Sequence, residues 1–340
     1  MRNPIFLATL AFCTSSLMAQ EVTLKVSHFL PPNSNYQKLV LEPWCAKLAT
    51  DSGNQLKCQI YPAMQLGGTP PQLVDQVKNG VADVIWTSPS YSTGRFPYTE
   101  ALEQPFVLPP GGLAGSKAMW DYYTQFATKD YVDYKMLAIF SGSGVIFSTS
   151  NKPLLGLDSF KGVKLRSSSR SAAKLVTALG GSPVNMPPAQ ITEAISKGVV
   201  DGAVATWELV PAVKLEEVAK YHIEGPTDKP GFTMNPLVML MNKQKYERLS
   251  PEMKAVIDKN SGLPLVELAG KAWDTATVEG RKKATLAGNK TLVIKPEDYE
   301  AMRKATANVE QEWIKEVAPK GLDGAALIRQ ARAIGAQHLK

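Results

Sequence analysis

The segment Gly162-Val-Lys-Leu-Arg-Ser-Ser-Ser-Arg170 has the pattern of a short strand that ends at Arg166 and leads directly into a helix. Further on, Ile195-Ser-Lys-Gly-Val-Val-Asp-Gly-Ala-Val-Ala-Thr-Trp207 ends one helix and enters another strand. In open α/β sheets, ligands bind just past the carboxyl ends of strands, and the guanidinium fork of arginine matches a carboxylate. These segments predict an α/β fold with an anion-binding cleft at Arg166.

A weaker copy of this pattern lies earlier in the chain, at Val77-Lys-Asn-Gly-Val-Ala-Asp83. Both copies end a helix, place a glycine after it and enter an apolar strand. Gly80 and Gly198 suit the position after a helix end, where a positive φ is required. Two similar units with a site between them are a common plan for ligand binding, so we expect two lobes.

The first 19 residues have the layout of a secretory signal peptide. Arg2 precedes an apolar run at residues 5–12, which is too short to span a bilayer, and small residues follow up to Ala19. We therefore predict that the protein is exported to the periplasm and cleaved after Ala19. A lipid or uncleaved anchor is the alternative, since Cys13 would suit a lipoprotein site, although the bulky Phe12 before it argues against one.

Without the signal peptide the chain keeps two cysteines, Cys45 in a helix pattern and Cys58 in the strand pattern that follows. An even pair in an exported chain favours a disulfide. Two buried thiols are the alternative.

The composition excludes several classes of function. A hydrophobic content of 44% over 340 residues allows two domains with real cores. The net charge of +7 is spread along the chain without basic blocks, so no nucleic-acid partner is expected. The three histidines, at positions 28, 222 and 338, are not at metal-binding spacing, and neither a Gly-x-Ser-x-Gly elbow nor a phosphate-binding glycine loop is present. We predict no enzyme activity, no metal and no cofactor.

Six short motifs occur in one order along the mature chain. They are Tyr61-Pro-Ala-Met-Gln-Leu-Gly-Gly68, Gly80-Val-Ala-Asp83, Leu165-Arg166, Met186-Pro187, Gly198-Val-Val-Asp-Gly202 and Met241-Asn-Lys243. Together they resemble the extracytoplasmic solute-binding subunits of TRAP transporters, the DctP-like family, almost from end to end of the mature chain. Each motif alone is a weak signal, and the shared order makes the resemblance specific.

The resemblance implies a two-lobed α/β periplasmic binding protein with mixed sheets, hinge-crossing strands and a long hinge-spanning helix. Lobe I would contain residues 20–143 and 232–271, and lobe II residues 144–231 and 272–340. It also implies that Arg166 clamps the carboxylate of a small organic acid, which the protein delivers to the membrane subunits of a sodium-coupled TRAP permease.

The chain departs from one version of this pattern. Many sialic-acid-type members carry a second arginine in the crossing strand before Ser-Asn. Here Gly144-Val-Ile-Phe-Ser-Thr-Ser-Asn151 has Ile146 at that place. A doubly clamped sugar acid is therefore disfavoured, and an apolar or aromatic acid is favoured.

Further ligand contacts are expected near the ends of the predicted strands. Besides Arg166, the predicted set is Arg170, Tyr91, His28, Trp207, Thr206 and Asn235. A helix-surface position is the alternative for Arg170, and core packing is the alternative for Trp207. Glu208 is a further candidate for a hydrogen bond to the ligand or the hinge, and Trp86 could line the site or pack in the core.

These features predict a periplasmic protein that binds and releases a small organic carboxylate for a TRAP-type permease. Three alternatives remain open at this stage. The same fold could present a ligand to a membrane sensor kinase, the chain could belong to another tripartite binding-protein family, or it could be an exported enzyme without a recognisable catalytic set.

Overall fold

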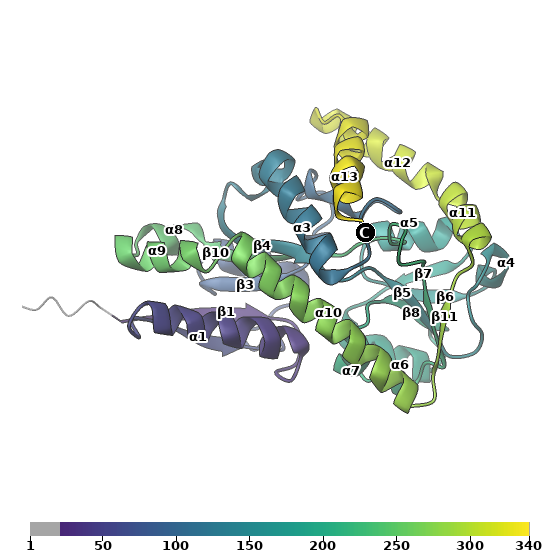
Figure 1. Cartoon of the computed structure of the whole chain (residues 1–340), viewed down its shortest axis with the longest axis horizontal. Coiled ribbons are helices and arrows are strands. Elements are labelled where there is room, and N and C mark those ends of the chain that lie inside the picture. Colours follow the sequence, from purple (N-terminus) through teal and green to yellow (C-terminus); the bar gives the residue numbers. More distant parts are fainter. Residues whose placement is uncertain (1–20, 340) are drawn as a thin grey trace, which may run out of the picture.

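The computed structural model describes residues 21–339, which form a five-stranded sheet and a six-stranded sheet with helices packed around both (Figure 1). This arrangement confirms the predicted α/β class. The predicted signal peptide at residues 1–19 lies outside the described residues.

The first sheet has the strand order β2-β1-β3-β10-β4. Its strands are β1 (Val22–His28), β2 (Leu56–Tyr61), β3 (Val84–Thr87), β4 (Tyr134–Ser141) and β10 (Pro236–Asn242). β1 is parallel to β2 and β3, whereas β10 is antiparallel to β3 and β4. The sheet is therefore mixed. In the sequence, β10 comes after most of the strands of the second sheet.

The second sheet has the strand order β11-β9-β5-β8-β6-β7. Its strands are β5 (Ile146–Thr149), β6 (Lys164–Ser167), β7 (Ser182–Asn185), β8 (Gly202–Ala205), β9 (Tyr221–Glu224) and β11 (Lys290–Val293). β6 is parallel to β7 and β8, and β5 is antiparallel to β8 and β9. The carboxyl ends of β6 and β8 therefore lie at the same edge of this sheet.

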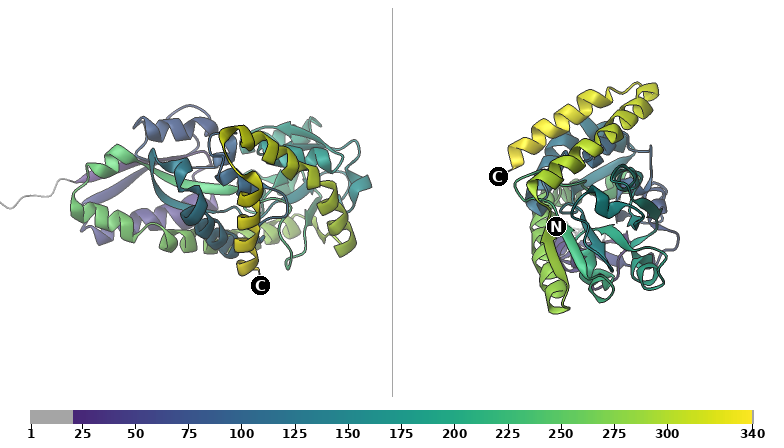
Figure 2. Two further views of the ribbon diagram at one scale, coloured as in Figure 1. Left: turned by 90° about the horizontal axis from the view of Figure 1, so that it is seen from above. Right: turned by 90° about the vertical axis from the view of Figure 1, so that its right-hand side faces the viewer.

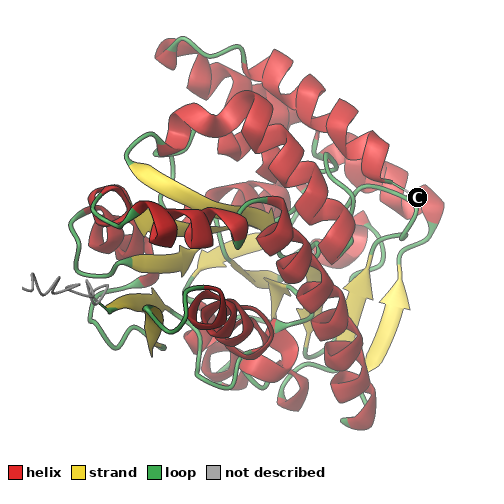
Figure 3. Ribbon diagram, turned by 60° about the vertical axis from the view of Figure 1, so that its left-hand side comes forward, coloured by secondary structure: helices red, strands yellow, loops and turns green. Residues whose placement is uncertain are grey.

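β10 shows why an unbroken apolar run forms a strand here. Leu237, Met239 and Met241 pack into one hydrophobic cluster, while Val238 and Leu240 pack into another. Because successive side chains of a strand point to opposite faces, both faces of the first sheet are covered. Figure 3 shows the strands lying between layers of helices.

The chain links the sheets through residues 142–145, residues 225–235 and helix α10 (Leu263–Leu286). α10 runs diagonally across the molecule in Figure 1 and contacts α3 (Gly112–Tyr122) and β4 at one end, and α7 (Leu209–Ala212) and β11 at the other. A Cβ atom added at Gly270 would lie 2.7 Å from Leu113 Cα, and one added at Gly280 would collide with the Trp207 carbonyl oxygen. Glycines thus let this hinge-spanning helix approach both lobes closely.

The remaining helices pack around these elements. They are α1 (Glu42–Asp51), α2 (Leu73–Lys78), α4 (Leu157–Phe160), α5 (Arg170–Ala178), α6 (Ile191–Ser196), α8 (Lys243–Glu247), α9 (Pro251–Lys259), α11 (Pro296–Ala305), α12 (Ala307–Val317) and α13 (Gly324–His338). Across residues 21–339, no helix combines the length and the apolar character needed to cross a membrane.

The C-terminal helices lie along one side of the molecule, as the end-on view in Figure 2 shows. Trp313, Val317 and Ile328 from α12 and α13 share a hydrophobic cluster with Met119 of α3 and Ile139 of β4. The C-terminal segment thus contributes to the core of the first sheet. The lobe boundaries given above, including the assignment of residues 272–340 to lobe II, stay a prediction.

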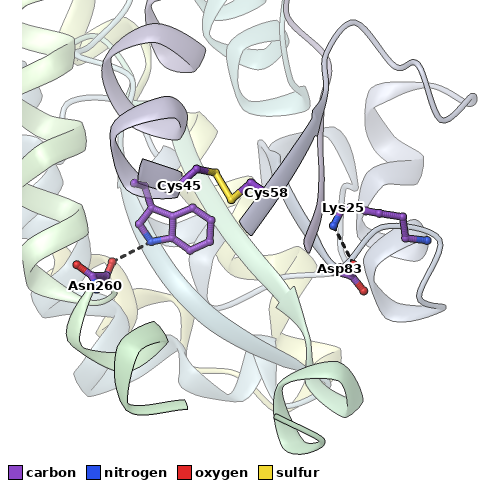
Figure 4. The surroundings of a disulfide bond; sticks show 6 residues. Lys25, Cys45, Cys58, Asp83 and Asn260 are labelled. Carbon is purple, nitrogen blue, oxygen red and sulfur yellow. Dashed lines mark hydrogen bonds between the residues drawn. A yellow bond between two sulfur atoms is a disulfide. The ribbon is translucent and has the colours of Figure 1, made fainter. Parts of the chain in front are cut away.

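The predicted disulfide is present between Cys45 of α1 and Cys58 of β2, with the two Cα atoms 5.7 Å apart (Figure 4). It ties the first helix to the edge strand of the first sheet. Closing a loop of this length stabilises the fold by about 3 kcal/mol on the chain-entropy account.

Candidate functional site

A small chamber lies between the two sheets, at the carboxyl ends of β1, β3, β6 and β8. The residues that line it are Phe29, Leu30, Trp86, Tyr91, Val145, Arg166, Ser168, Pro188, Val204, Ala205, Thr206, Glu208, Leu209, Asn235 and Leu237. The chamber leaves about 30 Å³ open to the centres of water-sized molecules. Both lobes contribute to it, as the cleft predicted from strand ends requires.

Arg166 is the penultimate residue of β6 and reaches into the chamber with only 1% of its surface exposed. Its Nε donates to the Met186 carbonyl at 3.0 Å, and its Nη1 donates to the Val204 carbonyl at 3.1 Å. Within residues 21–339, Nη2 has no hydrogen-bond partner. Two backbone carbonyls therefore hold the guanidinium in place, while one buried donor remains available to a ligand.

The chamber wall from the first sheet is aromatic. Phe29, Trp86 and Tyr91, which we call the first-sheet wall, contact one another through their rings. Phe29 stacks on Trp86 at 4.8 Å with an interplanar angle of 7°, and Tyr91 meets the edge of Phe29 at 5.6 Å. Tyr36 stacks on Trp86 at 3.8 Å and completes the support. This wall offers a rigid flat surface on which a ring can pack.

Tyr91 is the point where the first-sheet wall meets Arg166. It lies in the 3-10 helix Pro89–Tyr91 that follows β3, where the sequence predicts it. Burial raises the pKa of the Tyr91 hydroxyl, and the neighbouring Arg166 guanidinium acts in the opposite direction. The phenol is therefore neutral at physiological pH, and its hydroxyl can donate to an anion held by Arg166.

The chamber wall from the second sheet is polar. Arg166, Thr206 and Glu208 form this second-sheet wall. The Thr206 hydroxyl donates to Glu208 Oε1 at 2.5 Å, while Glu208 Oε2 has no hydrogen-bond partner among the described residues. Burial raises the pKa of the Glu208 carboxyl to about 7, and the hydrogen bond from Thr206 opposes that rise. The carboxyl is thus poised between its neutral and ionised forms near pH 7.

Asn235 also lines the chamber, from the crossing segment that precedes β10. Its Oδ1 accepts a hydrogen bond from the Ser88 hydroxyl at 2.8 Å. The side chain thus links the hinge to the loop that carries Tyr91. The structure places Arg166, Tyr91, Thr206 and Asn235 of the predicted set at one chamber, and their roles as ligand contacts stay a prediction.

His28 does not line the chamber but lies behind Trp86, fully buried. Its Nδ1 accepts from the Leu30 backbone N–H at 3.3 Å, and its Nε2 lies 3.1 Å from Gln37 Oε1. Burial lowers the pKa of this imidazole to about 4, against a smaller opposing effect of Gln37. A neutral ring that accepts at Nδ1 must donate from Nε2, so His28 supports the first-sheet wall from behind.

Arg170 and Trp207 also lie outside the chamber. Arg170 donates through Nη2 to Glu316 Oε1 at 2.7 Å and lines an open groove of about 540 Å³ that shares Tyr91 and Ser168 with the chamber. The Trp207 indole donates to Glu224 in the core of the second sheet. A helix-surface position for Arg170 and core packing for Trp207 are the alternatives that the sequence left open for these two residues.

Phe29, which lines the chamber, was not identified from the sequence, while Trp86 and Glu208 were raised only as further candidates outside the predicted set. Phe29 directly follows β1, so its side chain takes the opposite side of the backbone from His28. Glu208 follows Trp207 in the turn after β8, and that turn directs the carboxyl into the chamber and the indole into the core. The signal available in the sequence for Phe29 and Glu208 was their position just past strand ends, whereas Trp86 lies within β3.

A ligand chamber between two α/β lobes, with a buried arginine at a strand end, defines a two-lobed solute-binding protein. The profile of the family described as Bacterial extracellular solute-binding protein, family 7 (DctP) matches residues 26–316. The chain belongs to this family, as the motifs predict.

Solved structures agree with this assignment. A marine metagenome TRAP solute-binding protein specific for aromatic acid ligands, solved with metahydroxyphenylacetate and with 3-hydroxybenzoate, is 41% identical. It matches with a TM-score of 0.91 over 94% of this chain and 100% of that chain. A TRAP solute-binding protein from Rhodoferax ferrireducens with copurified benzoate is 36% identical, with a TM-score of 0.89 over 93% of this chain and 98% of that chain.

A third solved relative is the TRAP periplasmic solute-binding protein of Bordetella bronchiseptica with bound (R)- and (S)-mandelate. It is 28% identical, with a TM-score of 0.83 over 93% of this chain and 99% of that chain. The protein is thus a solute-binding protein that captures a small organic carboxylate for a TRAP-type secondary transporter. The sensor-kinase alternative is not favoured by these comparisons.

Proposed function

We propose that the protein is a periplasmic receptor for a small aromatic monocarboxylate, which it binds and releases without chemical conversion. The leader pattern at residues 1–19 and the Cys45–Cys58 disulfide support the periplasmic location, because disulfides persist in oxidising compartments.

The observation that carries the proposal is the placement of Arg166 Nη2, which is buried and, among the described residues, unpartnered beside the first-sheet wall. A carboxylate would accept from Nη2, and the ring attached to it would pack on Phe29 and Trp86. Among the described residues that line the chamber, Arg166 is the one with a permanent positive charge. One cation favours one carboxylate over a dicarboxylate.

The size and apolarity of the chamber favour the same ligand class. The chamber is small and lined mainly by apolar side chains, which suits a compact planar acid better than an extended one. Ile146, at the place of the second arginine in sialic-acid-type members, packs in a hydrophobic cluster of the second sheet. Two relatives at 36% and 41% identity carry benzoate, 3-hydroxybenzoate or metahydroxyphenylacetate, which supports an aromatic acid here.

The energetics are consistent with capture at low concentration. A dissociation constant near 1 μM corresponds to about −8 kcal/mol. A charge-assisted hydrogen bond to a buried guanidinium contributes roughly 1.5–3 kcal/mol, and ring packing contributes roughly 0.5–1.5 kcal/mol beyond its area burial. Removal of the ring surface from water must supply most of the remainder.

Calorimetry on the mature protein, unfolded and refolded to remove any carried-over ligand, tests the proposal. The panel contains benzoate, phenylacetate, a sugar acid, an aliphatic dicarboxylate and the amide of each aromatic acid. We expect an aromatic acid to bind at micromolar concentration and its amide to bind at least 100-fold more weakly. Tight binding of the sugar acid or the dicarboxylate, with no aromatic acid bound, would refute the proposal.

A further inference from the structure

The chamber contains two polar atoms of opposite chemistry that have no partner among the described residues, both on the second-sheet wall. Arg166 Nη2 is a donor, and Glu208 Oε2 is an acceptor when the carboxyl is ionised. Arg166 is 1% exposed and Glu208 is 8% exposed, so solvent satisfies neither atom. A benzoate-like ligand would use the first atom and leave the second without a partner.

We propose that Glu208 is a specificity-determining residue that accepts a hydrogen bond from a hydroxyl group on the ligand ring, so that the preferred ligand is a hydroxylated aromatic acid. The inference rests on the proposed function, and it names which aromatic acids that site selects.

The local hydrogen bonds leave Glu208 Oε2 available for this role. Thr206 already occupies Oε1, and it holds the carboxyl in one orientation. The Trp273 indole Nε1 is the competing donor inside the protein: it is close enough to lower the pKa of the Glu208 carboxyl through hydrogen bonding, yet within residues 21–339 it lies beyond hydrogen-bond distance of any acceptor. A ring hydroxyl at Oε2 can donate to the ionised carboxylate or accept from the neutral acid. The hydrogen bond can therefore form both above and below the Glu208 pKa of about 7.

Arg166 and Glu208 both influence the hydroxyl of Tyr91 on the opposite wall. Arg166 lowers the pKa of the Tyr91 hydroxyl and Glu208 raises it, so Tyr91 lies within electrostatic reach of both groups. One small ligand held on the first-sheet wall can therefore meet Arg166 with its carboxylate and Glu208 with a ring substituent. Because both groups are held by hydrogen bonds, one ring position is favoured over the others.

An analogue without the hydroxyl leaves a buried acceptor unpaired, which a polar site penalises strongly. On the natural protein we expect one hydroxybenzoate isomer to bind roughly 10- to 100-fold more tightly than benzoate. The matching fluorobenzoate, of similar size but without a donor, should bind about as weakly as benzoate. This ligand series needs no variant, so a folding defect cannot confuse it.

The variant Glu208→Met removes the polar atoms and keeps an unbranched side chain. We expect it to bind the preferred hydroxybenzoate and benzoate within about threefold of each other, while benzoate binds at least as well as to the natural protein. The matched control is Glu216→Gln, since Glu216 is a buried glutamate outside the chamber whose Oε2 has no partner in the described part of the chain. This control should keep the full preference for the hydroxyl. The variant Trp273→Phe should also keep the preference for the hydroxyl, because the ligand hydroxyl bonds to Glu208 and not to the indole.

The outcomes separate this inference from the proposed function. If benzoate binds and no hydroxybenzoate isomer binds more tightly than its fluoro analogue, the role of Glu208 is refuted while the aromatic receptor stands. That role is likewise refuted if Glu208→Met keeps the hydroxyl preference. If no aromatic acid binds to the folded, stripped protein, both fail together.

Discussion

The first-sheet and second-sheet walls of the chamber differ in whether their side chains find all their contact and hydrogen-bond partners within the protein. On the first-sheet wall, Trp86 stacks on Phe29 and on Tyr36, and Tyr91 packs edge-on against Phe29. The second-sheet wall instead leaves a donor and an acceptor without partners among residues 21–339. The first-sheet wall therefore supplies shape and also belongs to a core, whereas the second-sheet wall supplies chemistry that the ligand completes.

This difference predicts that substitutions in the second-sheet wall weaken ligand binding with little effect on stability. Substitutions in the first-sheet wall should weaken both. Arg166→Met should have the largest effect on affinity. Loss of a buried charge pair with the ligand corresponds to about 3 kcal/mol, or roughly a 100-fold weaker aromatic acid. The unfolding free energy of the ligand-free protein should change by only about 1 kcal/mol, because relief of the buried cation offsets two lost hydrogen bonds.

Calorimetry and urea unfolding of the same sample check both halves of this prediction. Near-natural affinity in a folded Arg166→Met protein would remove Arg166 as the clamp. A large loss of stability without ligand would show instead that this arginine holds the second lobe together.

Trp86→Leu should affect both quantities. Trp86 is sandwiched between Phe29 and Tyr36 and is almost fully buried, so its replacement opens a cavity and removes two ring contacts. We expect a loss of about 2–4 kcal/mol in the unfolding free energy and a roughly 10-fold weaker aromatic acid. If affinity fell without any loss of stability, binding and stability would be separate on the first-sheet wall as well, and the predicted difference between the walls would be wrong.

The two walls should also respond to pH with opposite signs. Burial raises the pKa of Glu208 to about 7, whereas the unfolded carboxyl titrates near 4.3. Between about pH 4.3 and about pH 7, the native protein keeps a proton that the unfolded chain has already lost. Stability contributed by neutral Glu208 therefore falls as pH rises through this window, by at most about 1.4 kcal/mol per pH unit.

Behind the first-sheet wall, His28 acts in the other direction. Burial lowers its pKa to about 4, so the unfolded chain takes up a proton near pH 6.5 that the native ring refuses until about pH 4. Its contribution to stability is therefore lost as pH falls from 6.5 toward 4.

Urea titrations at closely spaced pH values test these signs. Glu208→Gln should remove a downward contribution between about pH 4.3 and pH 7, so that stability rises more steeply with pH across the His28 window of about pH 4 to 6.5. Part of the downward slope should remain in this variant and extend to about pH 8, since burial also raises the pKa of Glu103 to about 8. An unchanged slope in Glu208→Gln would show that this carboxyl is ionised in the native chamber.

The sequence predicted the elements that a single physical pattern defines. The unbroken apolar pattern at residues 236–242 predicts a strand, which is β10, and the pattern at residues 263–287 predicts a helix, which is α10 to within one residue. Arg166 was identified because a strand end followed by a helix is a local signal. The pattern at residues 296–318 predicts one helix, which the structure divides at Thr306 into α11, packed on α4, and α12, packed on α5 and α13; such tertiary packing is not visible in local propensity.

The rest of the site depended on which way neighbouring side chains point. His28 and Phe29 are adjacent, as are Trp207 and Glu208, and in each pair the sequence favoured the residue that the fold turns into the core. A one-residue change in register at a strand end exchanges the two faces. Strand-end patterns cannot fix that register, whereas the packing of Trp86 on Tyr36 and of Trp207 under Gly280 does.

Arg170→Met should have the smallest effect on ligand affinity. It therefore sharpens the comparison between Arg166 and Arg170, which are four residues apart. The Arg170 side chain is about half exposed and pairs with Glu316, which also pairs with Lys174. An exposed ion pair of this kind contributes roughly 0–1 kcal/mol, and Lys174 remains to neutralise the glutamate. We expect the affinity for an aromatic acid to change by less than about twofold in calorimetry at physiological salt. A tenfold loss would place Arg170 on the path of the ligand and extend the binding site from the chamber into the open groove.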